Sequence, residues 1–216
     1  MIELSSVPGR RVAVSEATSG SWEGGNVWPP AFQICACLDA QEILSAEALQ
    51  QAAVLECGAG CGLCGITASI LGAQRVVLSD LPVAVPILRD NACANGLVIN
   101  KSLEVQTLDW TETEQPLLAP PDGAFDLILA SECLYDPDMV VPLLRTAHRA
   151  CKPAGILVVA GIIGGETVRV FRRHLPRFFA ECVALPPSGD PSGEIPPIGR
   201  AVHRITMPHP SVLPDA

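Results

Sequence analysis

The residues with the clearest capacity for chemistry are a glycine-rich run and the acid that precedes it. A short apolar stretch, Ala53–Glu56, leads into three alternating glycines, Gly58, Gly60 and Gly62. Such glycines allow a tight turn and a close approach of the backbone to a ligand, and the start of a following helix offers free N–H groups. A carboxylate at Glu56 repels a pyrophosphate, but it suits a ligand that carries an ammonium group or hydroxyls.

A second acidic residue follows the glycine-rich run, at the end of the next expected strand. Asp80 closes the next expected strand, Arg75–Ser79, twenty residues after Gly60. An acid in that place accepts hydrogen bonds from ribose hydroxyls in nucleotide-binding α/β folds. The glycine run, Glu56 and Asp80 together therefore favour a nucleoside-binding loop over a tight turn beside a solvated acid.

The elements that must position these residues alternate between strand and helix, which predicts an α/β fold with a mainly parallel sheet. Two final strand candidates have no helix between them and should pair antiparallel. We therefore expect five parallel strands, an antiparallel C-terminal hairpin and helices on both faces. The expected strands are Ala53–Glu56, Arg75–Ser79, Leu103–Leu108, Phe125–Ala130, Gly155–Ile163, Phe178–Leu185 and Ala201–Met207, with a short one at Arg11–Ser15; the expected helices follow Trp28-Pro29-Pro30 and cover Leu63–Leu71, Val83–Asn95 and Met139–Ala150.

Length and charge limit the classes of partner. The chain has 216 residues, with 14 Lys and Arg against 23 Asp and Glu, a net charge of −9. This suits one domain over residues 1–216, with a short arm at 1–26 and a frayed tail at 208–216. The acidic balance argues against nucleic acid as the main partner.

The longest apolar run, Gly155–Ile163, is too short to cross a membrane, and the first residues have no apolar signal segment, so we expect the cytoplasm, or alternatively the nucleus.

Five short motifs carry a resemblance to a known family. The run E-C-G-A-G-C-G at 56–62 resembles the cofactor motif of the seven-strand, S-adenosylmethionine-dependent methyltransferases. The resemblance narrows to the methyltransferase-like protein-lysine methyltransferases, which modify non-histone proteins, through G-x-V-W-P at 25–29, V-x-L-S-D-L-P at 76–82, L-D-W at 108–110 and E-x-x-Y at 132–135. It covers about residues 22–140. It implies a Rossmann-like seven-strand methyltransferase sheet, the cofactor S-adenosyl-L-methionine and a lysine side chain of a protein as substrate.

The resemblance also implies a role for individual residues. Asp80 would hold the ribose hydroxyls, and Trp110 would cover the adenine face with its flat ring. Trp28 would lie near the methionine and adenosine side of the cofactor, and Ser131 would line the pocket where relatives more often have alanine. The full set of expected cofactor-binding residues is Trp28, Glu56, Gly58, Ala59, Gly60, Asp80, Trp110 and Ser131.

Glu132 and Tyr135 are the expected catalytic residues, because they follow the fourth strand of the expected sheet, beside the methyl group to be transferred. The carboxylate would orient a substrate amine, and Tyr135 would shape the entry channel and exclude water. Methyl transfer needs a neutral amine, so much of the catalysis would be alignment. The family usually has Asp in place of Glu132, so the arm here is one methylene longer.

Three alternatives stay open at this point. Cys57, Cys61 and Cys64 have the spacing that holds a [4Fe–4S] cluster in radical enzymes that use the same cofactor. Against this, the cysteines interleave with the glycine motif, and the chain has too few strand–helix repeats for such a barrel. The other two are a different methyl acceptor (arginine, histidine or a small amine) and a non-catalytic binding module.

The nine cysteines are otherwise expected to be reduced thiols in the core, no metal site is expected, and the sequence leaves the oligomeric state open.

Overall fold

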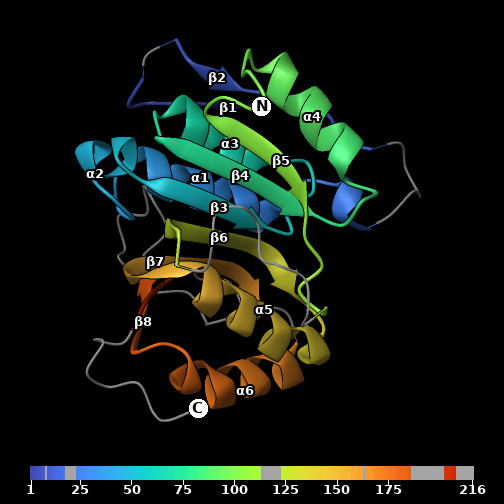
Figure 1. The fold of residues 1–216 in the computed structure, drawn as a ribbon, viewed down its shortest axis with the longest axis vertical. Helices are drawn as coiled ribbons and strands as arrows, with labels where there is room; N and C mark the ends of the chain where they lie inside the picture. The colour runs from blue at the N-terminus through green and yellow to red at the C-terminus, as the bar shows by residue number, and fades with distance from the viewer. Residues whose placement is uncertain (8, 18–22, 113–122, 163, 186–201, 208–216) are drawn as a thin grey trace.

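The main sheet has seven strands in the order β5-β4-β3-β6-β7-β9-β8 (Figure 1). The computed structural model describes residues 1–7, 9–17, 23–112, 123–162, 164–185 and 202–207. The five strands from β5 to β7 are parallel, whereas β9 runs antiparallel to both β7 and β8. This confirms the predicted sheet. The strands are β3 (Ala53–Cys57), β4 (Arg75–Asp80), β5 (Leu103–Thr107), β6 (Phe125–Leu134), β7 (Cys151–Ile162), β8 (Glu181–Leu185) and β9 (Val202–Thr206).

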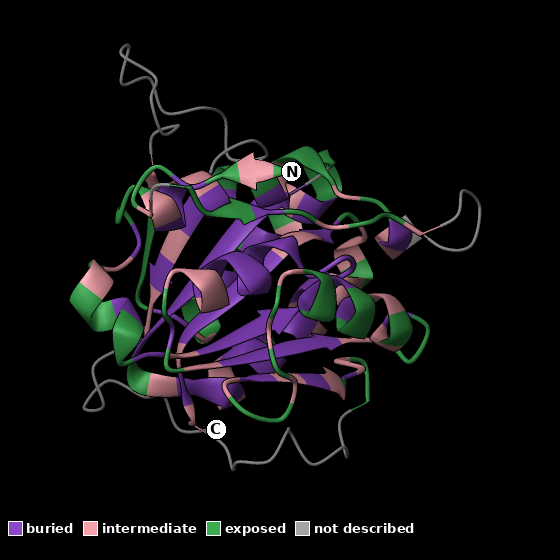
Figure 2. Ribbon diagram, turned by 90° about the horizontal axis from the view of Figure 1, so that it is seen from above, coloured by how far each residue is buried: buried purple, intermediate pink, exposed green. Residues whose placement is uncertain are grey.

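Helices cover both faces of this sheet, as predicted. Side chains alternate along each strand, so Val54 packs toward α1, α3 and α4, while Leu55 packs toward α5 and α6. Figure 2 shows the buried strands in the middle and the exposed helix faces outside. The helices are α1 (Pro29–Asp39), α2 (Ala46–Gln50), α3 (Leu63–Ile70), α4 (Val85–Ala94), α5 (Pro137–Ala150) and α6 (Gly165–His174), with short 3-10 turns at Glu23–Gly25 and Leu175–Arg177.

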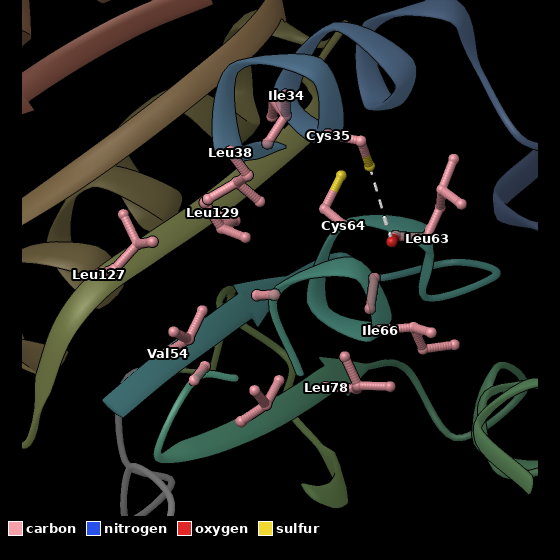
Figure 3. Packing of buried hydrophobic residues seen from close by; sticks show 14 of the residues in the cluster. Ile34, Cys35, Leu38, Val54, Leu63, Cys64, Ile66, Leu78, Leu127 and Leu129 are labelled. Carbon is pink, nitrogen blue, oxygen red and sulfur yellow. Dashed lines mark hydrogen bonds between the residues drawn. The ribbon is translucent and has the colours of Figure 1, made fainter. Parts of the chain in front are cut away.

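Helix α1 packs directly on α3, the helix that follows the glycine-rich loop (Figure 3). Two prolines open α1, where their missing N–H groups cost nothing and their fixed φ suits the first turn. The buried face of α1 then presents Ile34, Cys35 and Leu38 to the sheet and to α3. The thiol of Cys35 donates to the Leu63 carbonyl at 3.7 Å, and Cys64 donates to the Ala31 carbonyl at 3.7 Å.

Two helices were not predicted from the sequence. In α6 only Thr167 and Phe171 are buried, and the rest of the helix is rich in arginine, so the segment has few apolar residues to mark it as a helix. The helix forms because Phe171 packs beneath α5, which is a contact between distant parts of the chain. The other, α2, is only 5 residues long and begins with Ser45, whose hydroxyl accepts from the Ala48 N–H at 3.2 Å.

The arm that precedes α1 lies against α4. Its first strand, β1 (Ile2–Glu3), pairs antiparallel with β2 (Arg11–Val12), which is shorter than the expected Arg11–Ser15. The residues after β2 bond instead to side chains of α4. Asn91 exchanges two hydrogen bonds with the Ser15 backbone, and Asn95 does the same with Ala13. The expected frayed tail at 208–216 lies outside the described residues, and in the part of the chain that the structure describes no helix is long and apolar enough to cross a membrane.

Candidate active site

A pocket of about 740 Å³ opens at the carboxyl ends of β3, β4 and β6. The chain crosses from one half of the sheet to the other between β3 and β6, and open α/β sheets bind ligands at such a switch point. The structure brings all the expected site residues together here, because every one of them lines this pocket: Trp28, Glu56, Gly58, Ala59, Gly60, Asp80, Trp110, Ser131, Glu132 and Tyr135.

The glycine-rich loop is fastened to the end of β4 by Asp80. The Gly60 N–H donates to one carboxylate oxygen at 2.8 Å, and the Leu81 N–H donates to the other at 2.6 Å. Gly60 has a φ of +54°, and a Cβ there would lie 2.7 Å from the Gly24 carbonyl oxygen, so only glycine fits. Each carboxylate oxygen can accept more than one hydrogen bond. Asp80 can therefore hold the loop and still receive hydroxyl groups from a ligand.

Glu56 borders the pocket, yet its side chain also holds the start of α3. It is 2% exposed, and its Oε2 accepts a hydrogen bond from the Gly65 N–H at 2.8 Å. Burial raises the pKa of Glu56 from 4.5 to about 7. The carboxyl is thus poised between its neutral and charged forms near neutral pH. The sequence predicted a ligand contact here; the anchoring of the helix could not be read from spacing alone.

Trp110 and Cys133 close around Gly58 on the floor of the pocket. A Cβ on Gly58 would lie 2.9 Å from the Trp110 ring and 2.6 Å from the Cys133 sulfur. Cys133 Sγ also lies 3.2 Å from the carbonyl oxygen of Cys57. Sequence reasoning placed Trp110 here but missed Cys133, although it stands within the same Ser131–Tyr135 segment that drew attention to Glu132. The absence of a side chain at residue 58 therefore lets the Trp110 ring and the Cys133 sulfur pack directly against the backbone of the glycine-rich loop.

The segment that carries Glu132 is a bulge within β6. The strand was expected to end at Ala130, but it continues to Leu134. Ser131 pairs with Ala160 and Leu134 pairs with Ile162, so two residues of β6 face the single Gly161 of β7. Glu132 has a φ of +54°, which is unusual for a residue with a side chain. Strained positions of this kind cluster at functional sites.

Two polar atoms in this bulge are buried without a hydrogen-bond partner among the described residues. They are Ser131 Oγ and Glu132 Oε2. Burial also raises the pKa of Glu132 above its ordinary value. Buried polar atoms are nearly always paired in folded proteins. The two unpaired atoms therefore mark the bulge as a candidate functional position.

The charge of the pocket is one-sided. Among the described residues, its lining contains four acidic side chains and none from Lys, Arg or His: Glu56, Asp80, Asp109 and Glu132. Asp109 was missed in the sequence, although it lies in the L-D-W motif. At the mouth, Trp28 is 43% exposed and Tyr135 is 55% exposed, beside exposed Leu81 and Val83. An acidic interior with an apolar mouth suits a positively charged ligand and a partner that covers the opening.

The three cysteines of the glycine-rich run face different parts of the molecule. Cys57 packs on the α5 side of the sheet, and Cys64 packs against α1 on the opposite side. Cys61 Sγ lies 3.4 Å from the Gly25 carbonyl oxygen. Within the described ranges, no group of three or more His, Cys, Asp or Glu side chains could hold a metal ion. The side-chain geometry therefore gives no support to a cluster on these three sulfurs.

A family model for lysine methyltransferases matches residues 8–171. The chain belongs to this lysine methyltransferase family. Its match extends from the arm, through the glycine-rich loop and the Glu132 bulge, to α6. The resemblance inferred from five short motifs is thus confirmed, and the match extends beyond residues 22–140 at both ends.

Several vertebrate proteins are similar in sequence to this chain. The chain is 31% identical over 157 residues to EEF1A lysine methyltransferase 3 of Mus musculus, covering 71% of this chain and 62% of that one. It is 34% identical over 154 residues to protein N-lysine methyltransferase METTL21A of Mus musculus, covering 71% and 67%. A third, protein-lysine methyltransferase METTL21E of Mus musculus, is 33% identical over 138 residues, covering 63% and 55%. The aligned part thus spans between a half and two thirds of the length of these relatives.

Solved structures support the fold of the lysine methyltransferase sheet. A ribosomal protein L11 methylase from Lactobacillus delbrueckii subsp. bulgaricus superimposes with a TM-score of 0.57 at 21% identity, covering 81% of this chain and 78% of that one. The [4+2]-cyclase SpnF superimposes with a TM-score of 0.51 at 21% identity, covering 71% and 60%. Two such different reactions on one fold mean that the site, and not the sheet, must decide the chemistry.

Proposed function

We propose that this protein is an S-adenosyl-L-methionine-dependent protein-lysine N-methyltransferase that acts on a non-histone protein. The observation that carries the proposal is the acidic pocket at the switch point of the sheet. In it, a glycine-rich loop and Asp80 face a bulge that presents Glu132. The family membership and the protein-lysine activity named for the relatives favour the same reaction.

The residues present fit the cofactor. The pocket volume is in the range of small-molecule sites, and its acidic lining suits a ligand that carries both an ammonium and a sulfonium charge. Trp110 lines the pocket, and its flat ring would cover the adenine. Asp80 would accept the ribose hydroxyls, and Trp28 would close the pocket from the start of α1.

When bound, S-adenosyl-L-methionine supplies an electrophilic methyl group. The chain's own contribution is then to present a neutral lysine nitrogen in the correct direction. Glu132 would accept a hydrogen bond from that nitrogen and so direct its lone pair, while the Tyr135 ring at the mouth would surround the lysine stem and exclude water. Alignment of this kind accounts for a large share of the rate of a transfer between two bound groups.

The test is transfer of a labelled methyl group in a cell lysate. The purified protein is incubated with methyl-labelled cofactor, and labelled proteins are identified by mass spectrometry. We expect methyl-lysine in the wild-type reaction. We expect Glu132→Ala to reduce turnover by about 10²–10⁴-fold, the scale of a positioned acid–base group, with little change in cofactor affinity. Label on arginine, histidine or a small molecule would reassign the acceptor, and cofactor binding without any transfer would favour a binding module.

The location we propose is the cytoplasm or nucleus. All nine cysteines are free, and seven of them are buried. Reduced thiols in a core fit a compartment that keeps disulfides from forming. Fractionation of cells that express the full chain tests this location.

A further inference from the structure

Glu132 sits in a niche that exists because the residue opposite it has no side chain. A Cβ built on Gly161 would lie 2.6 Å from Glu132 Oε2. The same point lies 2.7 Å from Cγ of Pro30, in the first turn of α1. Gly161 is also the one residue of β7 that faces the two bulged residues of β6. The side chain of Glu132 therefore extends over the backbone of Gly161, next to the ring of Pro30.

The niche accounts for the unusual state of this carboxylate. Oε2 is buried and has no hydrogen-bond partner among the described residues, although the residue itself borders the pocket. A charged oxygen would ordinarily turn toward water. Here the bulge gives Glu132 its left-handed backbone, and the space above Gly161 receives one end of its side chain. Backbone and niche together select one direction for the carboxyl group.

From this geometry we propose that Gly161 and Pro30 are positioning residues for methyl transfer. Gly161 provides the space that receives Glu132, and Pro30 forms the wall that stops the carboxylate from moving away from the bulge. Neither residue would touch the substrate. The inference rests on the proposed function, because it assigns a purpose to the orientation of Glu132.

Gly161→Ala tests the niche directly. The carboxylate would have to move by about 0.8 Å to reach an ordinary van der Waals separation of 3.4 Å from the new Cβ. A misplacement of about 1 Å in an active site can cost about 10²-fold in rate. We expect kcat to fall by about 10- to 100-fold, while the Kd for S-adenosyl-L-methionine stays within about twofold, because the glycine-rich loop and Asp80 are untouched.

Gly96→Ala is the matched control. Gly161 and Gly96 share a φ of +75°, so an alanine meets an unfavourable left-handed φ at both positions, but nothing lies within 4 Å of a Cβ at Gly96. This control variant should keep the turnover of the wild type. An equal loss of kcat in both variants would mean that backbone strain alone is responsible, and would overturn the inference.

Rescue by a shorter acid separates positioning from a general structural role. Glu132→Asp retracts the carboxylate by one methylene and so makes room for the new Cβ. In the wild-type background this change should lower kcat, but in the Gly161→Ala background it should raise kcat above that of Gly161→Ala alone. Losses that simply multiply in the double variant would contradict a shared niche.

Pro30→Ala tests the wall without adding an atom, so it avoids a steric block to folding. Its control is Pro29→Ala, which removes the neighbouring proline from the same helix turn. We expect Pro30→Ala to lower kcat at unchanged cofactor affinity, and Pro29→Ala to leave kcat unchanged. The same loss of kcat in both would assign the effect to the start of α1 rather than to the niche.

A readout without turnover keeps this test separate from that of the proposed function. The reactivity of the Glu132 carboxyl toward a water-soluble carbodiimide and an amine can be followed by mass spectrometry. Gly161→Ala should increase labelling of Glu132 several-fold, and Gly96→Ala should not. Increased labelling in a protein whose wild type transfers no methyl group would support the niche and reject the proposed reaction. Unchanged labelling in Gly161→Ala would reject the niche.

Discussion

Replacing Glu56 by glutamine should reduce the decrease in stability that this protein undergoes between mildly acidic and mildly basic pH. Glu56 is 2% exposed, and burial raises its pKa from 4.5 to about 7. The folded protein therefore keeps a proton on Glu56 over a pH range in which the unfolded chain has already lost it. The stabilisation is complete below about pH 4.5 and is lost as the pH rises through about 7.

The size of the effect follows from the shift itself. Each pKa unit corresponds to about 1.4 kcal/mol, so Glu56 should lower the free energy of unfolding by about 3 kcal/mol over the whole range. Glutamine has the same shape and can still accept from the Gly65 N–H, but it does not ionise. Between about pH 5 and pH 8, the unfolding free energy of the wild type should therefore fall by about 2–3 kcal/mol relative to Glu56→Gln.

Urea unfolding across this pH range measures the difference, with Glu104→Gln as the control. The pKa of Glu104 is lowered by its hydrogen bond and ion pair with Arg75, at 2.8 Å. The stability that a carboxylate gains from a lowered pKa is lost only as the pH falls toward that lower pKa. The free energy of unfolding of Glu104→Gln should therefore differ from that of the wild type by a constant amount between about pH 5 and pH 8. Parallel curves for Glu56→Gln and the wild type would refute the assignment of the titration to Glu56.

Four further outcomes are expected. Asp80→Ala should weaken S-adenosyl-L-methionine binding by about 1–3 kcal/mol, because a charged acceptor is lost from the loop; calorimetry that gives an equal affinity would remove Asp80 from the site. The triple alanine variant of Cys57, Cys61 and Cys64, if folded, should bind the cofactor as the wild type does, and stoichiometric iron in the wild-type protein would contradict this. Asn91→Ala should lower the free energy of unfolding by about 2–4 kcal/mol, because its buried amide bonds to Ser15 and also to the Cys61 carbonyl at 2.9 Å. Asn95→Ala, which breaks a similar but exposed pairing, should cost about 1 kcal/mol or less in a denaturant titration.

The fold alone does not determine the reaction, because proteins with different activities share it. A methylase and a cyclase share the sheet at similar TM-scores. What distinguishes this chain is the set of side chains at the carboxyl ends of β3, β4 and β6, and above all the unpaired atoms of Ser131 and Glu132. Experiments at these two residues therefore bear on function more directly than any further comparison of folds.

The sequence by itself determined the sheet and the contents of the pocket, because both depend on local signals. Short apolar runs followed by glycine or helical periodicity are encoded within a few residues, and the carboxyl ends of parallel strands necessarily meet at one edge. Glu56, Asp80 and Glu132 could therefore be assigned to one pocket from these signals, whereas Trp110 was placed there by the family resemblance. The motif spacing also identified the family, which the match over residues 8–171 confirms.

Only the tertiary structure decided how those residues are held, because each support comes from a distant part of the chain. The Glu132 bulge depends on its register with Gly161, and nothing near residue 132 in the sequence specifies that partner. The burial of Glu56 against α3 sets its pKa, and α6 forms because Phe171 packs beneath α5. Local patterns determine which groups can act, whereas the packing of distant elements fixes their protonation and direction.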